Sequence, residues 1–301
     1  MDRSNFARMD AIRNRRPAAL YNWRARKDKN MAASFDPESL ADELLALHET
    51  GSLVTPFSER HSGLTAEAGY RAAARLHASR LERGWRPLGR KIGFTNRTIW
   101  PRYGVYEPMW GTVYDRTVIF ARADHASVPL AGLAQPRIEP EICFRLRAAP
   151  PVTHDAEALL GSIEWVAHSI EIVQCHHPDW KLKIADCTAD NGLHGRLIVG
   201  TPIPVAELPG LAAKLPALEV DLRKGGAVVD RGTGSNVLGS PLEALAFLVE
   251  ILSQQPDAPP LAAGELISTG TLTDAHPVAP GESWSTAFEG LPLKGLLVSF
   301  T

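Results

Sequence analysis

The sequence predicts an α+β protein in which a short helical part precedes a β-rich part. Between residues 36 and 84, apolar residues recur at the spacing of amphipathic helices. Beyond residue 84, the pattern changes to short apolar or alternating runs that are separated by Gly and Pro. The later helices are too few and too irregular for a repeating βα pattern, so a doubly wound parallel sheet is not expected.

Two helices are expected in the N-terminal part. Asp36 is a suitable N-cap residue, Pro37 fits the first turn, and Gly51 ends the first apolar-periodic run. The second helix is expected to begin near Thr65 and to end at Gly84. Three further helices are expected within the β-rich part, over residues 155–165, 179–189 and 241–254.

The β-rich part contains nine candidate strands. Leu218, Val220 and Leu222 alternate with charged residues, as on a strand with one buried face. The run Lys224-Gly225-Gly226 then reverses the chain into the next apolar run, which predicts a hairpin. The nine expected strands cover residues 88–94, 117–120, 138–146, 166–173, 196–199, 217–223, 227–230, 266–269 and 293–300.

Composition restricts the class of protein. Hydrophobic residues make up 45% and charged residues 22% of the 301 residues, which is typical of a globular chain. The net charge of −2 gives no reason to expect a nucleic-acid partner. The most apolar stretch, 242–252, contains two glutamates and is too short to cross a membrane, so no membrane association is expected. Three cysteines without CxxC spacing argue against a disulfide scaffold, and a cytoplasmic location is therefore expected.

The N-terminal 30 residues differ in charge from the rest of the chain. They contain nine Lys or Arg and three Asp, a net +6 against −2 for the whole chain, which leaves −8 for the remainder. They lack an apolar segment of the kind found in secretory signals. One interpretation is a basic tail for nucleic acid or anionic lipid. We favour a disordered leader upstream of a natural start at Met31, because this composition cannot bury enough surface to become ordered.

The most informative segment is the run Arg137-Ile138-Glu139-Pro140-Glu141. On a strand, Glu139 and Glu141 project from the same face, because side chains alternate. Pro140 predicts a strand start or an edge strand, since proline cannot donate to a ladder. Apolar residues follow, so the two carboxylates lie near a core, where like charges repel unless a cation lies between them. A metal ion or Arg137, on the same face, can supply that cation.

Glu171 adds a third carboxylate in another apolar run, between Ile170 and Ile172. An isolated carboxylate there is costly unless it is paired or coordinated. Three carboxylates suit a hard ion such as Mg²⁺ or Mn²⁺, and paired or surface glutamates are the alternative. A softer, zinc-like set is disfavoured because it has no recognised zinc spacing. Its members are Cys175, His176, His177, Cys187 and His194.

Seven motifs recur in order from about residue 37 to the C-terminus. They are 89–95 (GRKIGFT), 104–111 (GVYEPMWG), 135–141 (QPRIEPE), 170–173 (IEIV), 179–191 (DWK through ADN), 237–241 (VLGSP) and 268–273 (STGTLT). Together they resemble the 2-keto-4-pentenoate hydratase and 4-oxalocrotonate decarboxylase branch of the fumarylacetoacetate hydrolase superfamily. One such motif would be a weak signal, whereas seven in register are specific.

The resemblance implies a mixed β-roll or barrel of the fumarylacetoacetase C-terminal-domain type, with peripheral helices and an N-terminal helical segment. It implies one catalytic domain over residues 31–301, with a helical part at 31–85 and a β-rich, metal-binding core at 86–301. The substrate would be a small 2-oxo acid whose carboxylate and keto oxygen chelate the ion. Chelation would stabilise an enolate, which hydration, decarboxylation or C–C cleavage can each use.

The resemblance also assigns roles to residues. Glu139, Glu141 and Glu171 would hold Mg²⁺ or Mn²⁺. Lys91 would act beside the ion as an acid/base or substrate-anchoring group. The candidates for substrate binding are Gly270, Thr271 and Thr273, together with the cationic side chains Arg137 and Lys181.

The chain departs from the family's hydratases at the proton-transfer positions. Those enzymes have an acid where this chain has Met109, and small hydroxyl residues where it has Gly192 and Leu193. His194 is therefore a candidate acid/base, because its unperturbed pKa near 6.5 suits proton transfer at neutral pH. Asp190, from the Asp-Asn pair just before it, is the second candidate catalytic residue.

Three functions remain open at this point. The first is a metal-dependent lyase, either a hydratase of 2-oxo-4-enoates or a decarboxylase of 4-oxalocrotonate-like acids. The second is an acylpyruvate-type C–C hydrolase that uses the same metal site. The third is a degenerate partner subunit of a hydratase–decarboxylase complex. The resemblance also implies a homo-oligomer, with hetero-association to a related decarboxylase or hydratase as a further expectation.

Overall fold

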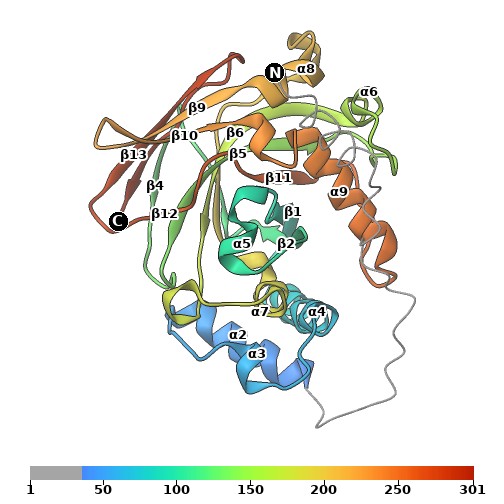
Figure 1. Ribbon diagram of the computed structural model, residues 1–301, viewed down its shortest axis with the longest axis vertical. Helices are drawn as coiled ribbons and strands as arrows, with labels where there is room; N and C mark the ends of the chain where they lie inside the picture. Colours follow the sequence, from blue (N-terminus) through green and yellow to red (C-terminus); the bar gives the residue numbers. More distant parts are fainter. Residues whose placement is uncertain (1–35) are drawn as a thin grey trace, which may run out of the picture. The chain divides into compact units, whose positions relative to one another are not determined.

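The computed structural model describes residues 36–301, shown in colour in Figure 1. The expected basic leader at 1–30 and the expected start at Met31 lie outside the described residues. The helices and sheets described below belong to one compact unit. Within that unit, no helix combines the length and the apolar character that a membrane span requires.

Helices and strands alternate irregularly along the described chain. The α-helices are α2 (Pro37–Thr50), α3 (Phe57–Arg60), α4 (Ala66–Glu82), α5 (Trp100–Tyr103), α6 (Ala156–Leu160), α7 (Ile184–Ala189), α8 (Leu211–Ala217) and α9 (Pro241–Gln254). The 3₁₀ turns are η2 (Arg97–Ile99), η3 (Pro178–Trp180), η4 (Asn191–Leu193), η5 (Val205–Glu207) and η6 (Gly234–Asn236). The strands are β1 (Pro87–Gly93), β2 (Met109–Tyr114), β3 (Val118–Phe120), β4 (His125–Val128), β5 (Arg137–Leu146), β6 (Ile163–Val173), β7 (His194–Val199), β8 (Ile203–Pro204), β9 (Glu219–Lys224), β10 (Ala227–Thr233), β11 (Leu266–Thr271), β12 (His276–Pro277), β13 (Ser283–Glu289) and β14 (Leu297–Phe300).

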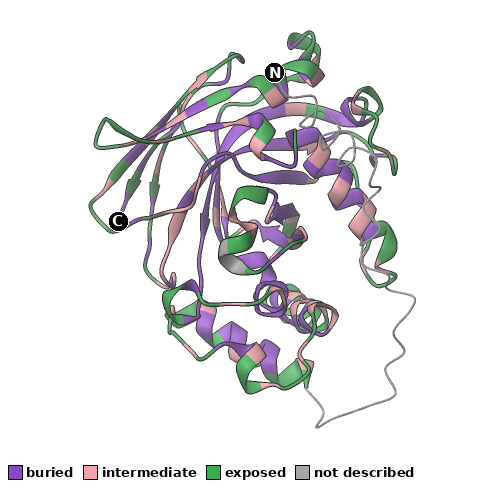
Figure 2. Cartoon of the chain, viewed as in Figure 1, coloured by how far each residue is buried: buried purple, intermediate pink, exposed green. Residues whose placement is uncertain are grey.

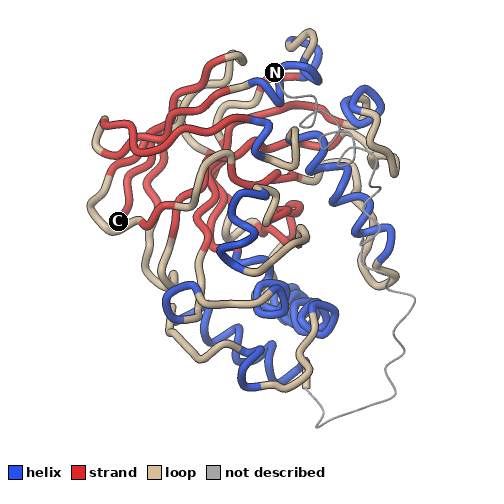
Figure 3. Tube along the Cα trace, viewed as in Figure 1, coloured by secondary structure: helices blue, strands red, loops and turns tan. Residues whose placement is uncertain are grey.

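The two expected N-terminal helices are confirmed, with the expected caps. The Asp36 carboxylate accepts hydrogen bonds from two backbone amides of the first turn of α2, and Gly51 ends the helix at φ 67°. Thr65 caps α4 through its side-chain oxygen. Both helices lie with α3 and α7 in the lower part of Figure 3 and share one apolar cluster with them, which includes Leu44 and Leu76. This helical layer reaches the β-rich part through α7.

A large mixed sheet forms the centre of the described unit. Its strands follow the order β2-β1-β11-β5-β6-β7-β3, with β12 paired to β5 and β8 paired to β6. The pairs β1–β11 and β3–β7 are parallel and the remaining pairs are antiparallel. The sheet curls as a half-barrel in Figure 1, with β5 and β6 as its longest antiparallel pair. These two strands carry all three candidate metal ligands.

A second sheet of five strands packs against the outer face of the first. Its order is β10-β9-β13-β14-β4, and the expected hairpin is confirmed, with Lys224 and Ala227 paired at its tip. Ile170 and Ile172 of the large sheet meet Trp284 and Val298 of the small sheet in a buried cluster. Figure 2 shows the burial of β5 and β6 along most of their length. Alternation along β6 therefore directs Glu171, which lies between the two isoleucines, to the opposite face of the large sheet.

The structure corrects two of the expected helices. The helix expected over 155–165 ends at Leu160, and β6 begins three residues later because the chain turns at Gly161. The helix expected over 179–189 is split into η3 and α7. Asp179 and Trp180 both have a φ of 58°, a left-handed conformation that no α-helix can contain.

The strand predictions also had gaps. β2, β4, β8, β12 and β13 were not expected, and the strand expected over 293–300 is reduced to β14. Residue 217, expected to start a strand, instead ends the helix α8. The missed strands are short or carry mixed polar residues, so their pairing depends on neighbours that are distant in the sequence.

The prediction that Pro140 marks a strand start or an edge is wrong, because β5 continues through it between β11 and β6. The carbonyl of Pro140 accepts a hydrogen bond from the backbone amide of Leu272 (2.8 Å). In an antiparallel strand, the N–H and C=O of one residue point to the same neighbour, so the missing N–H faces β11. The register of β11 shifts there, between Ser268 and Thr271. The bulge in β11 thus accommodates a proline in the middle of the sheet.

Candidate active site

Three carboxylates from two adjacent strands meet on one face of the large sheet. Glu139 and Glu171 are direct partners in the antiparallel register, and Glu141 follows two residues along β5. Each of the three offers an oxygen within 4.8 Å of the others. Glu141 and Glu171 are fully buried, whereas Glu139 is partly exposed. The alternation predicted from the sequence therefore brings the three side chains together.

Some of these carboxylate oxygens have few partners. Oε2 of Glu141 accepts hydrogen bonds from the Ser268 hydroxyl (2.5 Å) and from the Gly270 amide (3.0 Å). Its other oxygen, Oε1, is buried without a hydrogen-bond partner among the described residues. Oε2 of Glu171 has no hydrogen bond there either, although it lies 3.2 Å from Nζ of Lys91. Buried carboxylate oxygens that point at one another fit a hard divalent ion, which prefers oxygen ligands.

The electrostatics of the cluster support the same interpretation. Burial, together with repulsion between the carboxylates, raises the pKa of Glu139 and of Glu141 to about 8, although Lys91 opposes the shift. Burial also raises the pKa of Glu171, again against the effect of Lys91. Without a cation, this cluster retains protons at neutral pH. A divalent ion would replace those protons.

Lys91 is the cationic side chain of the site. It extends from β1, is buried, and donates a hydrogen bond from Nζ to the carbonyl oxygen of Gly192 (2.9 Å). Burial alone would lower the pKa of Lys91, but Glu171 and the two other carboxylates together raise it above its ordinary value. Lys91 therefore carries its proton at neutral pH and faces the carboxylates.

A second layer of histidines holds the ligands in place. His194 lies between the Oε1 atom of Glu171 and the hydroxyl of Thr117, at 2.8 Å from each. Burial and the nearby Lys91 keep the pKa of His194 well below its usual range, so the ring is neutral and donates from Nδ1 to Glu171. His168 donates from Nδ1 to the backbone carbonyl of Glu141 (3.0 Å), which anchors that ligand's peptide group. Such partners orient metal ligands.

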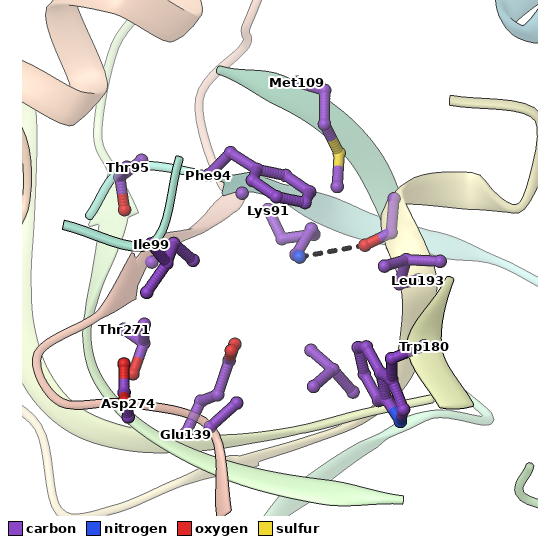
Figure 4. Close-up of a pocket in the computed structure, with 15 residues that line it drawn as sticks. Lys91, Phe94, Thr95, Ile99, Met109, Glu139, Trp180, Leu193, Thr271 and Asp274 are labelled. Carbon is purple, nitrogen blue, oxygen red and sulfur yellow. Dashed lines mark hydrogen bonds between the residues drawn. The ribbon is translucent and has the colours of Figure 1, made fainter. Parts of the chain in front are cut away.

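A pocket opens beside the carboxylates and is shown in Figure 4. Its empty space is about 580 Å³ when the part open to solvent is counted, so it is an open recess and not a sealed cavity. Glu139 enters it from one side, and the Lys91–Gly192 hydrogen bond crosses the opposite side. Much of the remaining wall is apolar. These wall residues are Phe94, Ile99, Met109, Val173, Trp180 and Leu193.

Gly270 and Thr271 line the pocket, as expected, but their polar groups already have partners. The amide of Gly270 donates to Glu141, and the Thr271 hydroxyl donates to the Thr273 carbonyl (2.9 Å). Thr273 itself is buried behind the pocket, with its hydroxyl on the Asp274 carbonyl (2.9 Å). This part of the loop thus supports Glu141 in the structure described here.

The two cationic candidates for substrate binding lie apart from the pocket wall. Arg137 stacks its guanidinium over the Trp180 ring, 4.2 Å from the ring centroid, and its charge favours the ionised form of Glu139. The Lys181 side chain is 78% exposed and pairs with Asp179 (3.3 Å). Lys181 follows η3 instead of lying within a helix, and it does not line the pocket.

The two proton-transfer candidates also lie outside the pocket. Both ring nitrogens of His194 are engaged behind Glu171, as described above. Asp190 is fully buried in a separate cluster, where its carboxylate accepts from Nε2 of His48 (2.6 Å) and from Nδ1 of His176 (2.7 Å). The zinc-like set is not assembled either, because His176 pairs with Asp190 and not with a cysteine.

Sequence reasoning missed several pocket residues. Thr95 lines the pocket with a buried hydroxyl that has no hydrogen-bond partner among residues 36–301. Asp274 and Trp180 also line it. Thr95 directly follows Phe94, whose φ of 54° turns the chain at the end of β1. Phe94 and Thr95 end the GRKIGFT motif, and this position was the sequence signal that could have assigned them to the pocket.

Comparisons with known proteins identify the family. Residues 107–293 match the model of the fumarylacetoacetate (FAA) hydrolase C-terminal domain. The chain is 32% identical to a 2-hydroxyhexa-2,4-dienoate hydratase of Comamonas testosteroni over 257 residues, which cover 84% of this chain and 94% of the relative. This chain belongs to the fumarylacetoacetate hydrolase family. It is also 30% identical to a 2-keto-4-pentenoate hydratase of Paraburkholderia xenovorans (strain LB400), over 84% of this chain and 91% of that enzyme.

Solved structures of the fumarylacetoacetate hydrolase family show the same fold. The 4-oxalocrotonate decarboxylase from Pseudomonas putida G7, complexed with magnesium and adipate, matches with a TM-score of 0.80 and 26% identity. The match covers 88% of this chain and 97% of that one. The α+β class and the mixed β-roll with peripheral helices are therefore confirmed.

Proposed function

We propose that this chain is a divalent-metal-dependent lyase that acts on a small 2-oxo acid. Glu139, Glu141 and Glu171 would hold Mg²⁺ or Mn²⁺. The observation that carries the proposal is the buried carboxylate cluster. It has an oxygen without a hydrogen-bond partner in the part of the chain that the structure describes, and it opens into a pocket beside Lys91. The hydratases among the relatives, and the magnesium in the related decarboxylase, support this assignment.

The bound ion would act as a Lewis acid, stabilising negative charge that develops on the keto oxygen of a chelated 2-oxo acid. Lys91 keeps its proton at Nζ and can donate it, or a hydrogen bond, to a substrate oxygen beside the carboxylates. The Thr95 hydroxyl, which has no hydrogen-bond partner within residues 36–301, can donate to a substrate carboxylate. The apolar wall makes the rest of the pocket a poor environment for charged groups.

Within this class, the lining of the pocket favours hydration of a 2-oxo-4-enoate with a short hydrocarbon tail. Lys91 is the only Lys or Arg that lines the pocket within the described range. Phe94 and Met109 lie on the side opposite Glu139 in Figure 4, where an extended substrate would place its tail. A second carboxylate there would lose its hydration without gaining a cation, which is costly.

Decarboxylation of a 4-oxalocrotonate-like acid is the second candidate. Met109 and Leu193 occupy the positions where the hydratases that the sequence resembles have an acid and a hydroxyl residue, so their means of orienting water is absent. Asp274 is the remaining acidic side chain of the pocket apart from Glu139, among the residues described, and it could orient water for hydration instead. The reaction products distinguish the two outcomes.

The test is a product assay on protein stripped of metal and then reloaded with Mg²⁺ or Mn²⁺. The panel contains 2-oxo-4-enoates with hydrogen or alkyl tails, 4-oxalocrotonate-like diacids and acylpyruvates. We expect a product 18 Da heavier than the enoate, which indicates water addition, in the metal-loaded protein only. Release of CO₂ from the diacids would support the second candidate. Cleavage of acylpyruvates to two acids would indicate the C–C hydrolase, and no turnover despite bound metal would favour the partner-subunit function.

A pair of variants tests the metal ligands themselves. Glu139→Gln removes one carboxylate charge from the cluster with little change in size, and Glu157→Gln does the same at an exposed position on α6. Isothermal titration with Mn²⁺ should show about one ion per chain in the wild type and in Glu157→Gln. Equal Mn²⁺ affinity in Glu139→Gln would remove the basis of the proposal.

The same proposal extends to organisation and location. We propose that residues 31–301 act as one catalytic domain, that the chain forms a homo-oligomer, and that it can associate with a related decarboxylase or hydratase. Light scattering of the purified protein, alone and mixed with such an enzyme, tests both associations. Three buried, unpaired cysteines support a reducing, cytoplasmic location, which cell fractionation checks.

A further inference from the structure

We propose that His48 and His176 are positioning residues for Lys91, because they clamp Asp190 and thereby hold the turn that supports the Lys91 ammonium group. This proposal rests on the proposed function, since it gives Lys91 its role. The three clamp residues do not line the pocket, so we assign them a role through the turn and not on the substrate.

The turn that supports Lys91 follows α7, and its backbone has an unfavourable conformation. Its three residues Asn191, Gly192 and Leu193 all have positive φ, at 48°, 69° and 62°. Such conformations are unfavourable for residues other than glycine, so contacts elsewhere must hold the turn. A Cβ on Gly192 would lie 3.2 Å from Cδ of Lys91, which shows how closely the turn approaches that side chain.

The turn is held on two sides. On one side, the Asn191 amide group pairs with both backbone groups of Thr112 on β2, at 2.8 and 2.9 Å. On the other side, the Asp190 carboxylate accepts one hydrogen bond from each histidine. His48 comes from α2 and His176 follows β6, so the clamp ties the helical layer and the large sheet to the turn.

Both oxygens of the Asp190 carboxylate are used without a ligand, and the one clamp nitrogen with no hydrogen-bond partner among the described residues is Nε2 of His176. The N···O distances of the clamp, 2.6 and 2.7 Å, are those of direct charge-assisted hydrogen bonds. Two ligands of a tetrahedral ion, each about 2.0 Å from it, would be roughly 3.3 Å apart. Gln174 satisfies Nδ1 of His48 (3.0 Å), and the two histidines lower the pKa of Asp190 despite its burial. Burial lowers the pKa of His48 to about 4, so its ring donates to Asp190 in the neutral form. The geometry therefore points to a hydrogen-bonded clamp and not to a second metal site.

The connection to Lys91 is short. Gly192 lies two residues after Asp190, and its carbonyl accepts the Lys91 hydrogen bond. Leu193, the next residue, forms part of the pocket wall, and its amide donates to the Asp190 carbonyl (2.8 Å). Release of Asp190 would let the turn relax and shift both Lys91 and the wall. The metal ligands on β5 and β6 would be unaffected.

The experiment compares variants that remove a clamp hydrogen bond with variants that restore it. His176→Leu removes the donor, whereas the amide nitrogen of His176→Asn takes the place of Nδ1. His48→Leu and His48→Gln form the second pair, since a glutamine nitrogen takes the place of Nε2. His125→Leu, an exposed histidine on β4, is the control for loss of a histidine.

The Leu variants should lower kcat about 10- to 100-fold, because a displacement of about 1 Å in a catalytic group has that effect. KM and Mn²⁺ affinity should stay within about threefold of the wild type, and the amide variants should recover most of the lost kcat. Wild-type kcat in both Leu variants, or an amide variant no better than its Leu counterpart, contradicts the clamp. If His176→Leu does not fold, the His48 pair decides by the same criteria.

Two further measurements separate this proposal from the proposed function and from a metal site. In hydrogen exchange, amides of residues 190–194 should exchange faster in the Leu variants while those of β5 and β6 do not. That comparison remains decisive even if the wild type turns over no member of the substrate panel, an outcome that would refute the proposed function. A Zn²⁺ ion bound by Glu141→Gln but lost on adding His176→Leu would overturn the clamp.

Discussion

Two clusters of charged side chains are buried in this molecule, and they differ in how far their charges are matched. In the clamp, one carboxylate accepts from two histidines and both of its oxygens are used. In the carboxylate cluster, three acids face one lysine, and Oε1 of Glu141 has no partner among the described residues. Burial is similar in both, so burial alone does not mark a functional site.

The difference shows which buried charges point to a ligand. A buried charge whose partners are all supplied by the chain stabilises a particular backbone arrangement. Where burial and mutual repulsion raise the pKa values of several carboxylates, the chain supplies too little positive charge, and a bound cation can supply the rest. Mutations in the clamp are therefore expected to change folding stability and the position of Lys91, and mutations in the carboxylate cluster to change metal binding.

The largest expected effect is on catalysis at the carboxylate cluster. Glu171→Gln should reduce turnover about 1000-fold or more, because Lewis-acid stabilisation contributes several kcal/mol. Steady-state assays at saturating Mn²⁺ measure this. Turnover within tenfold of the wild type would mean that Glu171 is a buried structural acid like Asp190.

The next largest expected effect is a difference in folding stability between a clamp variant and a variant of the carboxylate cluster. Asp190→Asn should lower the free energy of unfolding by about 3 kcal/mol or more, because it breaks a buried, fully paired network. Glu141→Gln, measured without metal, should leave the stability unchanged or raise it, since the amide is neutral like the protonated acid, keeps an oxygen for Ser268 and Gly270, and supplies a donor to the neighbouring acid. Urea unfolding followed by circular dichroism compares the two. Equal destabilisation by both substitutions would abolish the distinction between the clusters.

The second layer of the metal site should give an intermediate effect. His194→Leu removes the donor that orients Glu171, so Mn²⁺ affinity should fall about 10- to 100-fold. Isothermal titration provides the measurement, with His125→Leu as the control. An unchanged affinity would show that the strand alone orients Glu171.

The smallest expected effect is the pH dependence of metal stabilisation. The pKa values of Glu139 and Glu141 are raised to about 8 in the folded, metal-free protein, against about 4.3 for an unperturbed glutamate. Their protonated forms therefore favour the fold below about pH 4, and this contribution is lost as the pH rises through about 8. A bound ion removes that loss, so the increase in Tm on adding Mn²⁺ should grow by a few degrees between pH 5 and 8. Thermal scans with and without Mn²⁺ would falsify this if the increase shrank.

The carboxylate cluster could be predicted from the sequence because its determinants are local. Glu139 and Glu141 share a face through strand alternation alone, and Glu171 stands out between two isoleucines. The cluster is complete because Glu139 lies directly opposite Glu171 when β5 and β6 pair along their length. Lys91 came instead from the family resemblance.

The clamp and the pocket wall could not be predicted in the same way. His48 and Asp190 are 142 residues apart, and nothing local to either indicates the other. His194 was expected as an acid/base, and only the structure shows that both of its ring nitrogens are already used, by Glu171 and Thr117. The positive φ angles that turn Phe94 and Leu193 toward the pocket depend on tertiary contacts and not on local propensity.

Pro140 has a consequence for how this site can vary. The bulge in β11 accommodates the missing N–H of Pro140, and the same bulge directs the Gly270 amide at Glu141. Replacing Pro140 with valine would permit one more ladder hydrogen bond and a more regular sheet. That regular sheet would withdraw the donor from Glu141. At Pro140, a more stable sheet and the hydrogen bond from Gly270 to Glu141 are therefore incompatible. Selection for stability alone would remove that hydrogen bond from the site.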